Sequence, residues 1–542
     1  MTREQAQNIL LLSAAVILLT SGVLAQAPGL QPRLFHAADR CISCHNGIVS
    51  PRGEDISFGT DWRPSMMANA ARDPYWQASV RRESLVHPSA RAAIEDECAA
   101  CHMPMARFEA KSAGKMGEVF ANLQGAQAIS PLGRLAVDGS SCSMCHQIQD
   151  QGLGQRSSFT AGFSVDTATP LGKRRAFGPY KVDEGRQALM RSSSQFIPTE
   201  VRHIRESELC ATCHTLYTQA LGADGRPVGE LPEQVPYLEW KHSAYPGGQS
   251  CQSCHMPAVD SEVPITGVMG KPRDGVARHV FRAGNFFMPR ILNRHRFDLH
   301  VAALPGELDA ASRATVEHLQ SASAALAFES VEVKDGRLEA RLTIQNLAGH
   351  KLPSAYPSRR AWVHFTARDR FGRVVFESGA LNPDGSIAGN DNDASADVFE
   401  PHYDRIEKPG QVQVYEGILE GPDKKVTTVL LTAVRYVKDN RLLPDGFDKS
   451  TAPGDIAVRG EALGDGDFGG GGDRVLYAVD LDGAQGPFEV QAELWYQPIA
   501  FRWAHNLSQQ DAPEIQRFVS YYTSLSGQSA VALAKARAVA NP

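Results

Sequence analysis

The sequence lacks the signatures of several large classes of enzyme. Neither a P-loop nor a GxGxxG motif occurs in a strand–turn–helix context, so nucleotide chemistry is not expected. No Ser-His-Asp arrangement can be argued from spacing, and no cysteine stands outside a close pair, which leaves no free thiol nucleophile. The 55 basic and 61 acidic residues give a formal net charge of −6 without a basic stripe, so nucleic acid is not expected as a partner.

Long apolar runs are also scarce, and the main one lies at the N-terminus. Ile9 to Leu19 is apolar, follows a short polar stretch with the single cation Arg3, and precedes the small residues Ala25 and Ala27. This pattern predicts a secretory signal peptide over residues 1–27, with an uncleaved membrane anchor as the alternative because the first residues carry little charge. Nothing downstream approaches the roughly 18 apolar residues of a membrane-spanning helix. We therefore expect an exported protein, periplasmic or extracellular.

All ten cysteines fall into five C-x-x-C pairs, and a histidine follows the second cysteine of every pair. The pairs are Cys41 and Cys44, Cys98 and Cys101, Cys142 and Cys145, Cys210 and Cys213, and Cys251 and Cys254. C-x-x-C-H is the attachment motif of c-type haem, in which both thiols form thioethers and the histidine becomes the proximal iron ligand. The sequence thus predicts five haem c groups with His45, His102, His146, His214 and His255 as proximal ligands.

Other uses of paired cysteines explain the pattern less well. A disulfide framework fits an even number of cysteines in an exported chain, but it gives no reason for five trailing histidines. Structural zinc sites use C-x-x-C pairs without a fixed histidine step. A thioredoxin-like redox motif occurs once in a domain rather than five times.

The organisation of the chain changes near residue 325. The haem-bearing part, assigned to residues 28–324, is rich in alanine and in helix formers, and one of its helices is expected to begin at Ser65. Its motifs start between 41 and 68 residues apart, which is too little chain for an ordinary apolar core around each haem. The haems themselves are therefore expected to form much of the core, wrapped by short helices and loops.

Residues 325–505 alternate β-branched and aromatic residues with polar ones, and Lys334-Asp335-Gly336 is a hairpin signal. This pattern predicts an antiparallel β-sandwich of the Ig-like type. Residues 506–542 are expected to form a C-terminal helical segment, with helices at 513–524 and 528–540. The expected fold class is therefore α+β and multidomain. A glycine-rich stretch near Asp465 resembles a calcium-binding loop only loosely and is interpreted as a flexible hairpin tip.

Each iron needs a second axial ligand, and twelve of the 17 histidines remain for that role. Histidines a few residues upstream of a motif are well placed, and two others lie in aromatic or Gly/Pro-rich segments downstream. The candidates are His36, His203, His242, His279 and His350, with His87, His295 and His300 as reserves. Met66, Met67 and Met288 are weaker candidates, since each is better explained as a core residue. The supply of histidines predicts mostly bis-histidine haems of low potential. Lys351, Arg359 and Arg360 either pair with a haem propionate or form a solvated turn.

Several segments carry a family resemblance. They are SMMANAARDPYWQASVRRE, CAACHMPM, YLEWKHSAYPGGQSCQSCHMP, HVFRAGNFFM and GHKLPSAYPSRRAWVHF, and they lie between Ser65 and Phe365. The chain resembles bacterial multihaem (pentahaem) cytochromes c that join a cytochrome c554-type haem region to a β-sandwich. The resemblance implies electron transfer, bis-histidine haems, and functional positions at His279 and His350, without a substrate.

Three functions remain open. The first is a non-enzymatic electron carrier or relay, whose partners are other redox proteins acting as donor and acceptor. The second is a haem c oxidoreductase in which one haem keeps an open position for a small nitrogen or sulfur compound, although a C-x-x-C-K motif is absent. The third is a structural cytochrome that forms filaments or anchors a membrane-bound redox complex, with self-association through the sandwich.

Overall fold

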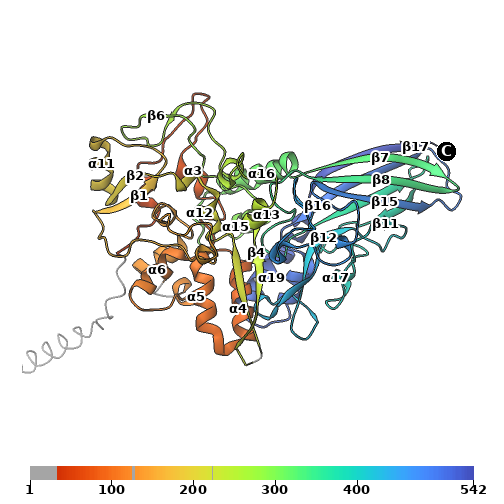
Figure 1. The fold of residues 1–542 in the computed structure, drawn as a ribbon, viewed down its shortest axis with the longest axis horizontal. Coiled ribbons are helices and arrows are strands. Elements are labelled where there is room, and N and C mark those ends of the chain that lie inside the picture. Colours follow the sequence, from red (N-terminus) through yellow and green to blue (C-terminus); the bar gives the residue numbers. More distant parts are fainter. Residues whose placement is uncertain (1–32, 125–127, 223, 542) are drawn as a thin grey trace, which may run out of the picture.

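The computed structural model describes residues 33–124, 128–222 and 224–541. The chain forms a part built of short helices, at the left of Figure 1, and a part built of long strands that extends to the right. The predicted signal peptide, residues 1–27, lies outside the described residues. Among the residues that are described, no helix is both long and apolar enough to cross a membrane.

All five C-x-x-C-H motifs lie on or at the end of a helix in the first part. These helices are α2 (Asp39–Ile42), α5 (Arg91–His102), α10 (Cys142–Cys145), α12 (Ser207–Ala211) and α14 (Cys251–His255). One helical turn brings both thiols of a motif and its histidine to the same side. The motifs therefore acquire the local geometry that haem attachment requires.

The remaining elements of this part are short, and loops join them. The helices are α3 (Phe58–Trp62), α4 (Pro74–Val86), α6 (Pro104–Ser112), α7 (Phe120–Leu123), α9 (Pro131–Val137), α11 (Glu184–Ser194), α13 (Pro236–Lys241), α15 (Phe287–Arg294) and α16 (Pro305–Ala322). The strands pair locally, as β1 (Arg174–Gly178) with β2 (Phe196–Glu200), β3 (Leu216–Leu221) with β4 (Pro227–Gln234), and β5 (Val263–Pro264) with β6 (Pro272–Arg273).

The helix expected to begin at Ser65 begins later, at Pro74. The Asp73 carboxylate accepts hydrogen bonds from the backbone N–H groups of Tyr75, at 2.8 Å, and Trp76, at 3.2 Å. Proline at the first helical position needs no N–H partner, so Asp73-Pro74 is a strong start signal. The prediction placed the start nine residues too early because it followed the apolar spacing and overlooked this cap.

The second part is a sandwich of two sheets, as predicted. One sheet contains β9 (Arg360–Arg368), β10 (Val374–Ser378), β12 (Val414–Glu420), β13 (Val426–Thr427), β14 (Arg435–Asp439), β16 (Phe488–Gln497) and β17 (Val531–Ala540). The other has the order β11 (Arg405–Ile406), β15 (Gly472–Asp480), β8 (Arg337–Asn346) and β7 (Ala324–Lys334). Pairing is antiparallel except between β11 and β15. The predicted turn is confirmed, since Asp335 and Gly336 have φ of 50° and 76° between β7 and β8.

The C-terminal segment is helical only in part. α18 (Phe501–Leu507) is followed by α19 (Pro513–Leu525), which confirms the first closing helix. The second prediction is wrong, because residues 531–540 form β17 and pair with β16 from Phe488 to Tyr496. Edge pairing along a long strand outweighs the helix propensity of an alanine-rich sequence, which amounts to only a few tenths of a kcal/mol per residue.

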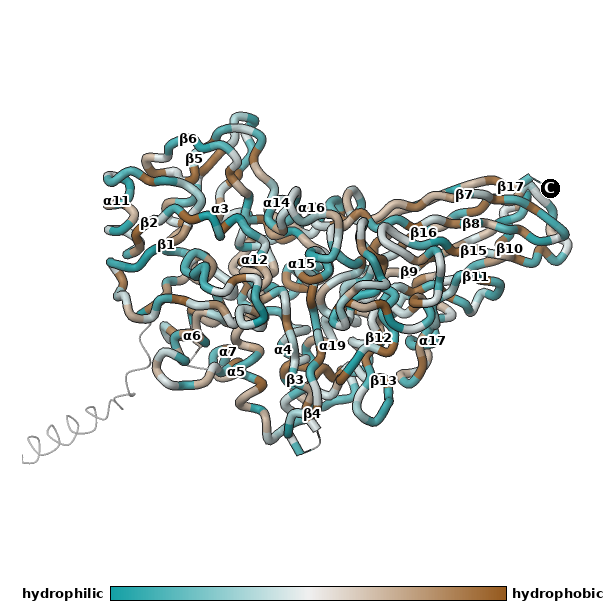
Figure 2. The backbone as a smooth tube through the Cα atoms, viewed as in Figure 1, coloured by the Kyte–Doolittle hydropathy of each residue, from teal (hydrophilic) through white to brown (hydrophobic). Residues whose placement is uncertain are grey.

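The two parts share one apolar core. Phe286, Phe287 and Ile291 at α15 pack in the same cluster as Leu342 and Val363 of the sandwich. A bidentate ion pair at 2.9 Å joins Arg81 of α4 to Glu514 of α19. In Figure 2, hydrophobic and hydrophilic residues alternate along the long strands, as expected for sheets with one buried face. The change near residue 325 is therefore a change of secondary structure within continuous packing.

Candidate haem-binding cavity

A single cavity of about 1450 Å³ receives residues from all five motifs. The five motif histidines line it, together with every motif cysteine except Cys98. None of the ten cysteines forms a disulfide. The disulfide reading of the cysteine pattern therefore has no support in the fold.

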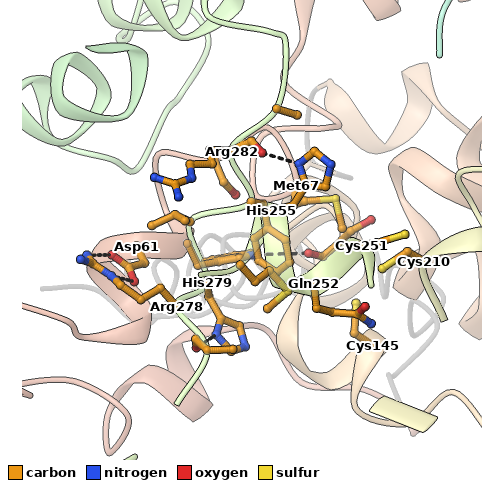
Figure 3. Close-up of a pocket in the computed structure, with 18 of the residues that line it drawn as sticks. Asp61, Met67, Cys145, Cys210, Cys251, Gln252, His255, Arg278, His279 and Arg282 are labelled. Carbon is orange, nitrogen blue, oxygen red and sulfur yellow. Dashed lines mark hydrogen bonds and ion pairs between the residues drawn. The ribbon is translucent and has the colours of Figure 1, made fainter. Parts of the chain in front are cut away.

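Four of the five motif histidines are oriented in the same way. Each ring donates its Nδ1 proton to a backbone carbonyl oxygen, which fixes the tautomer and leaves Nε2 free to bind a metal. The pairs are His45 with Ile265 (2.6 Å), His102 with Ala70 (3.1 Å), His146 with Phe177 (2.5 Å) and His255 with Arg282 (2.6 Å). Figure 3 shows the bond between His255 and Arg282.

Burial keeps these rings neutral. It lowers the pKa of His102 and of His255 to about 4, and it also lowers the pKa of His45, His146 and His214. A neutral imidazole with a free Nε2 is the form that binds iron. The residues present therefore fit a haem iron at each motif.

Two further histidines face motif histidines across the cavity. The ring centroids of His146 and His279 are 6.3 Å apart with 13° between the ring planes, and those of His255 and His350 are 6.3 Å apart with 4°. Two metal–nitrogen bonds of about 2 Å, plus about 1.1 Å within each ring, give about 6.2 Å. The spacing is therefore that of two imidazoles binding one iron from opposite sides.

His279 and His350 also share the orientation of the motif histidines. The Nδ1 proton of His279 is donated to the carbonyl oxygen of Ala277 at 3.2 Å, and that of His350 to the carbonyl oxygen of Lys351 at 2.9 Å. Both rings line the cavity. Their free Nε2 atoms are the second observation, after the ring spacing, that favours a role as iron ligands.

The other three distal candidates lie outside the cavity lining, and their Nε2 atoms are occupied. His36 Nε2 bonds Gln195 Oε1 at 2.9 Å, His203 Nε2 bonds the Ile148 oxygen at 2.8 Å, and His242 Nε2 bonds the Asp448 oxygen at 3.1 Å. The structure therefore gives no support to these three ligand predictions. The reserves His87, His295 and His300 do not line the cavity either, whereas Met66 and Met67 do.

One cavity histidine was missed. His318 lies on α16, and its ring centroid is 6.3 Å from that of His255, with 66° between the planes. Small residues at helical spacing, Ala311, Ala314 and Ala322, line the cavity from the same helix. That small-residue face is the only sequence signal that could have drawn attention to His318.

The motifs lie next to one another. The thiols of Cys41 and Cys142, of Cys101 and Cys213, and of Cys210 and Cys251 lie close enough for each pair to shift one another's pKa. The fourth motif therefore touches the second and the fifth, while the first touches the third. Groups attached at such positions lie close to one another.

In the basic turn after β8, two of the three cations form buried ion pairs. Lys351 Nζ lies 2.7 Å from Asp439 Oδ2, and Arg360 Nη1 lies 2.8 Å from Asp393 Oδ1. Propionate binding by Lys351 and Arg360 is therefore wrong, because both charges are already neutralised away from the cavity. Arg359 does line the cavity and remains available for a propionate.

A second cluster of potential metal ligands lies in the sandwich and comprises His402, Asp465 and Asp473. Its hydrogen bonds do not suit a metal. His402 Nδ1 accepts protons from the amides of Gln413 and Asn440, both at 3.0 Å, so the ring proton sits on Nε2. That proton is donated to Asp465 at 3.1 Å, which blocks the nitrogen a metal would need.

Comparison with solved structures shows a shared fold. A penta-haem cytochrome c552 from Thermochromatium tepidum superposes with a TM-score of 0.51 and 14% sequence identity, and the alignment covers 93% of this chain and 98% of that chain. The chain thus has the α+β multidomain fold of a multihaem cytochrome c. No protein-family model matches the chain, and a search of curated proteins returns no match.

Proposed function

We propose that the chain carries five haem c groups and transfers electrons among them and to other redox proteins. The observation that carries this proposal is the single cavity into which all five motif histidines project. When bound, haem c supplies an iron that changes its charge by one electron with little rearrangement. The penta-haem protein of similar fold and the contacts between motifs support the same conclusion.

The chain's own residues set the properties of the sites. Backbone carbonyl oxygens hold the motif rings with Nε2 directed into the cavity. His279 and His350 would complete two bis-histidine pairs, with His146 and His255 respectively. Such pairs favour low reduction potentials and exclude other ligands, which suits a relay rather than substrate turnover. We place this relay in the periplasm or outside the cell, in agreement with the predicted signal peptide.

One observation favours the second candidate, an oxidoreductase. Within the described residues, no histidine ring faces His45, His102 or His214 at the spacing seen for the other two motifs. Arg359 also lies close enough to His214 to help lower its pKa, after the larger effect of burial. An open position beside a cation would suit a small anionic nitrogen or sulfur compound.

EPR and visible spectra of the purified ferric protein test the two candidates. The relay predicts five haems per chain by pyridine haemochrome assay and only low-spin signals, unchanged by cyanide or nitric oxide. Each haem should also be reduced by a low-potential donor in stopped-flow measurements. A high-spin signal that shifts when cyanide is added would contradict the pure relay and support the oxidoreductase.

An ion pair made by the residue next to His279 gives a second prediction. The neighbouring Arg278 makes a bidentate ion pair with Asp61 of α3, at 2.5 and 2.9 Å (Figure 3). The variant Asp61→Asn should loosen His279 and raise the cyanide affinity of one haem roughly tenfold, the usual effect of losing such a supporting contact. A spectral cyanide titration measures this.

The matched control for Asp61 is Glu54, which pairs with the same Arg278 but whose side chain is 59% exposed. An exposed ion pair contributes little, so Glu54→Gln should bind cyanide like the unmodified protein. Equal effects of the two substitutions would show that Arg278 does not position His279.

A further inference from the structure

His350 reaches the cavity from the sandwich, in the loop between β8 and β9. We propose that four buried charged residues, Glu239, Lys351, Asp439 and Arg441, position His350 opposite His255. The sandwich is then a supplier of a haem ligand and not only an interaction module. This inference rests on the proposed function, since it concerns the haem of the fifth motif.

The four residues form a continuous chain of contacts. Lys351 Nζ lies 2.7 Å from Asp439 Oδ2, and Arg441 binds both oxygens of Asp439, at 2.8 and 2.7 Å. Arg441 Nη1 also lies 2.9 Å from Glu239 Oε1. Two cations and two anions thus neutralise one another across the boundary between α13 and the sandwich.

Glu239 also forms hydrogen bonds with the loop that carries His350. Its Oε2 accepts hydrogen bonds from the Lys351 N–H at 3.2 Å and from the Ser354 hydroxyl at 2.6 Å. These contacts flank His350 on its C-terminal side. Because Glu239 lies on α13, which precedes the fifth motif, the carboxylate ties the loop to the haem-bearing part.

The other side of the loop is fixed by the sandwich. Asn346 donates its side-chain amide protons to the carbonyl oxygens of His350, at 2.9 Å, and Leu442, at 3.0 Å. Leu352 and Leu442 exchange two backbone hydrogen bonds, both at 2.9 Å. His350 is therefore held between two anchored points, so its ring has little freedom to leave the orientation parallel to His255.

The four charged side chains are buried, and this burial favours a role in positioning His350. The side chains of Lys351 and Glu239 have no exposed surface, and that of Asp439 is 3% exposed. A buried charge network is not an efficient source of stability, because desolvation offsets the attraction. It does fix one geometry, since any displacement leaves a charge unpaired.

The test uses the full-length, haem-loaded chain and exogenous cyanide. His350→Ala is the reference and should convert one haem of five to a high-spin form that binds cyanide. Glu239→Gln preserves shape but removes the charge, and it should raise cyanide affinity at that same haem roughly 10–100-fold over the unmodified protein. Ser354→Ala removes a single hydroxyl from Glu239 and should have a smaller effect in the same direction.

Glu416→Gln is the matched control. Glu416 pairs with Lys438 at 3.0 Å, both side chains are buried, and the side-chain partners of Lys438 are Glu416 and the Val414 oxygen rather than members of the network. It should lose comparable stability yet keep the unmodified cyanide affinity. Matching cyanide affinities for Glu239→Gln and Glu416→Gln would overturn the inference.

Failure of the proposed function gives a different result. If His350→Ala leaves every haem low-spin, His350 is not a ligand, and the bis-histidine assignment fails before the network is tested. If Glu239→Gln does not yield haem-loaded protein, the cyanide affinity of Ser354→Ala tests the inference instead. An unchanged cyanide affinity in Ser354→Ala, beside an opened haem in His350→Ala, would also overturn the inference.

Discussion

A chain with serine at both Cys210 and Cys213 is expected to lose the folded haem-bearing part. The fourth motif lies next to the second through Cys101 and next to the fifth through Cys251, so a haem attached there would pack against two others. A single Leu→Ala cavity costs about 2–5 kcal/mol, and the loss of a haem removes far more packing, so unfolding free energy should fall by more than about 5 kcal/mol. Haem content, circular dichroism and limited proteolysis measure the outcome.

The first motif supplies the control for this prediction. Among the thiol contacts described, Cys41 touches only Cys142, so the first motif has fewer neighbours than the fourth. Serine at Cys41 and Cys44 should therefore remove one haem while the rest of the chain stays folded. If the two double variants lose the same amount of unfolding free energy, the number of contacts that a motif makes with other motifs does not determine how much its haem stabilises the core.

His279→Ala is expected to open the haem held by His146. Without the ring at 6.3 Å, that iron should become high-spin and bind cyanide, and one fifth of the low-spin EPR intensity should disappear. The loss should also slow electron exchange with the haem of the first motif, because His279 lies near His45 as well. EPR intensities and stopped-flow reduction test both effects.

His203→Ala is a suitable control for the loss of a buried histidine. The His203 ring is buried, but its Nε2 bonds the Ile148 oxygen and it does not line the cavity. This substitution should destabilise the chain modestly and leave all haem spectra unchanged. A high-spin haem in His203→Ala would restore the sequence-based ligand assignment and contradict the geometry described above.

The proximal sites could be proposed from the sequence because their chemistry is local. A C-x-x-C-H motif places two thiols and an imidazole on one helical turn, so five motifs identify five sites without knowledge of the fold. The hairpin at Asp335-Gly336 was predictable for the same reason, since a residue pair with positive φ specifies the turn. Both features depend on residues only a few positions apart.

The distal sites could be predicted only in part, since His279 and His350 do face motif histidines but the other three candidates do not. Their ligands come from distant segments, and proximity in sequence favoured His36, His203 and His242, whose Nε2 atoms bond elsewhere. His318 carries no motif at all. What separates the cavity histidines from the others is which ring nitrogen meets a backbone oxygen, and this depends on tertiary contacts such as that between His45 and Ile265.

The strand β17 shows a different limit of prediction from the sequence. Its sequence is rich in alanine, lysine and arginine, which favours a helix in isolation. Lys535, Arg537 and Val539 nevertheless alternate with less exposed residues, a period of two that indicates a strand. Pairing with β16 determined the outcome, and that partner lies too far along the chain for local propensity to reveal it.

The position of His350 has a consequence for how the protein matures. Synthesis proceeds from the N-terminus, so all five motifs emerge before the loop that supplies His350. Until the sandwich folds, His255 lacks the parallel ring of His350 and has only His318, tilted by 66°, beside it. On the ligand assignment proposed above, docking of the sandwich is the step that completes the fifth site, so a variant whose sandwich fails to fold would leave the haem of the fifth motif open to cyanide.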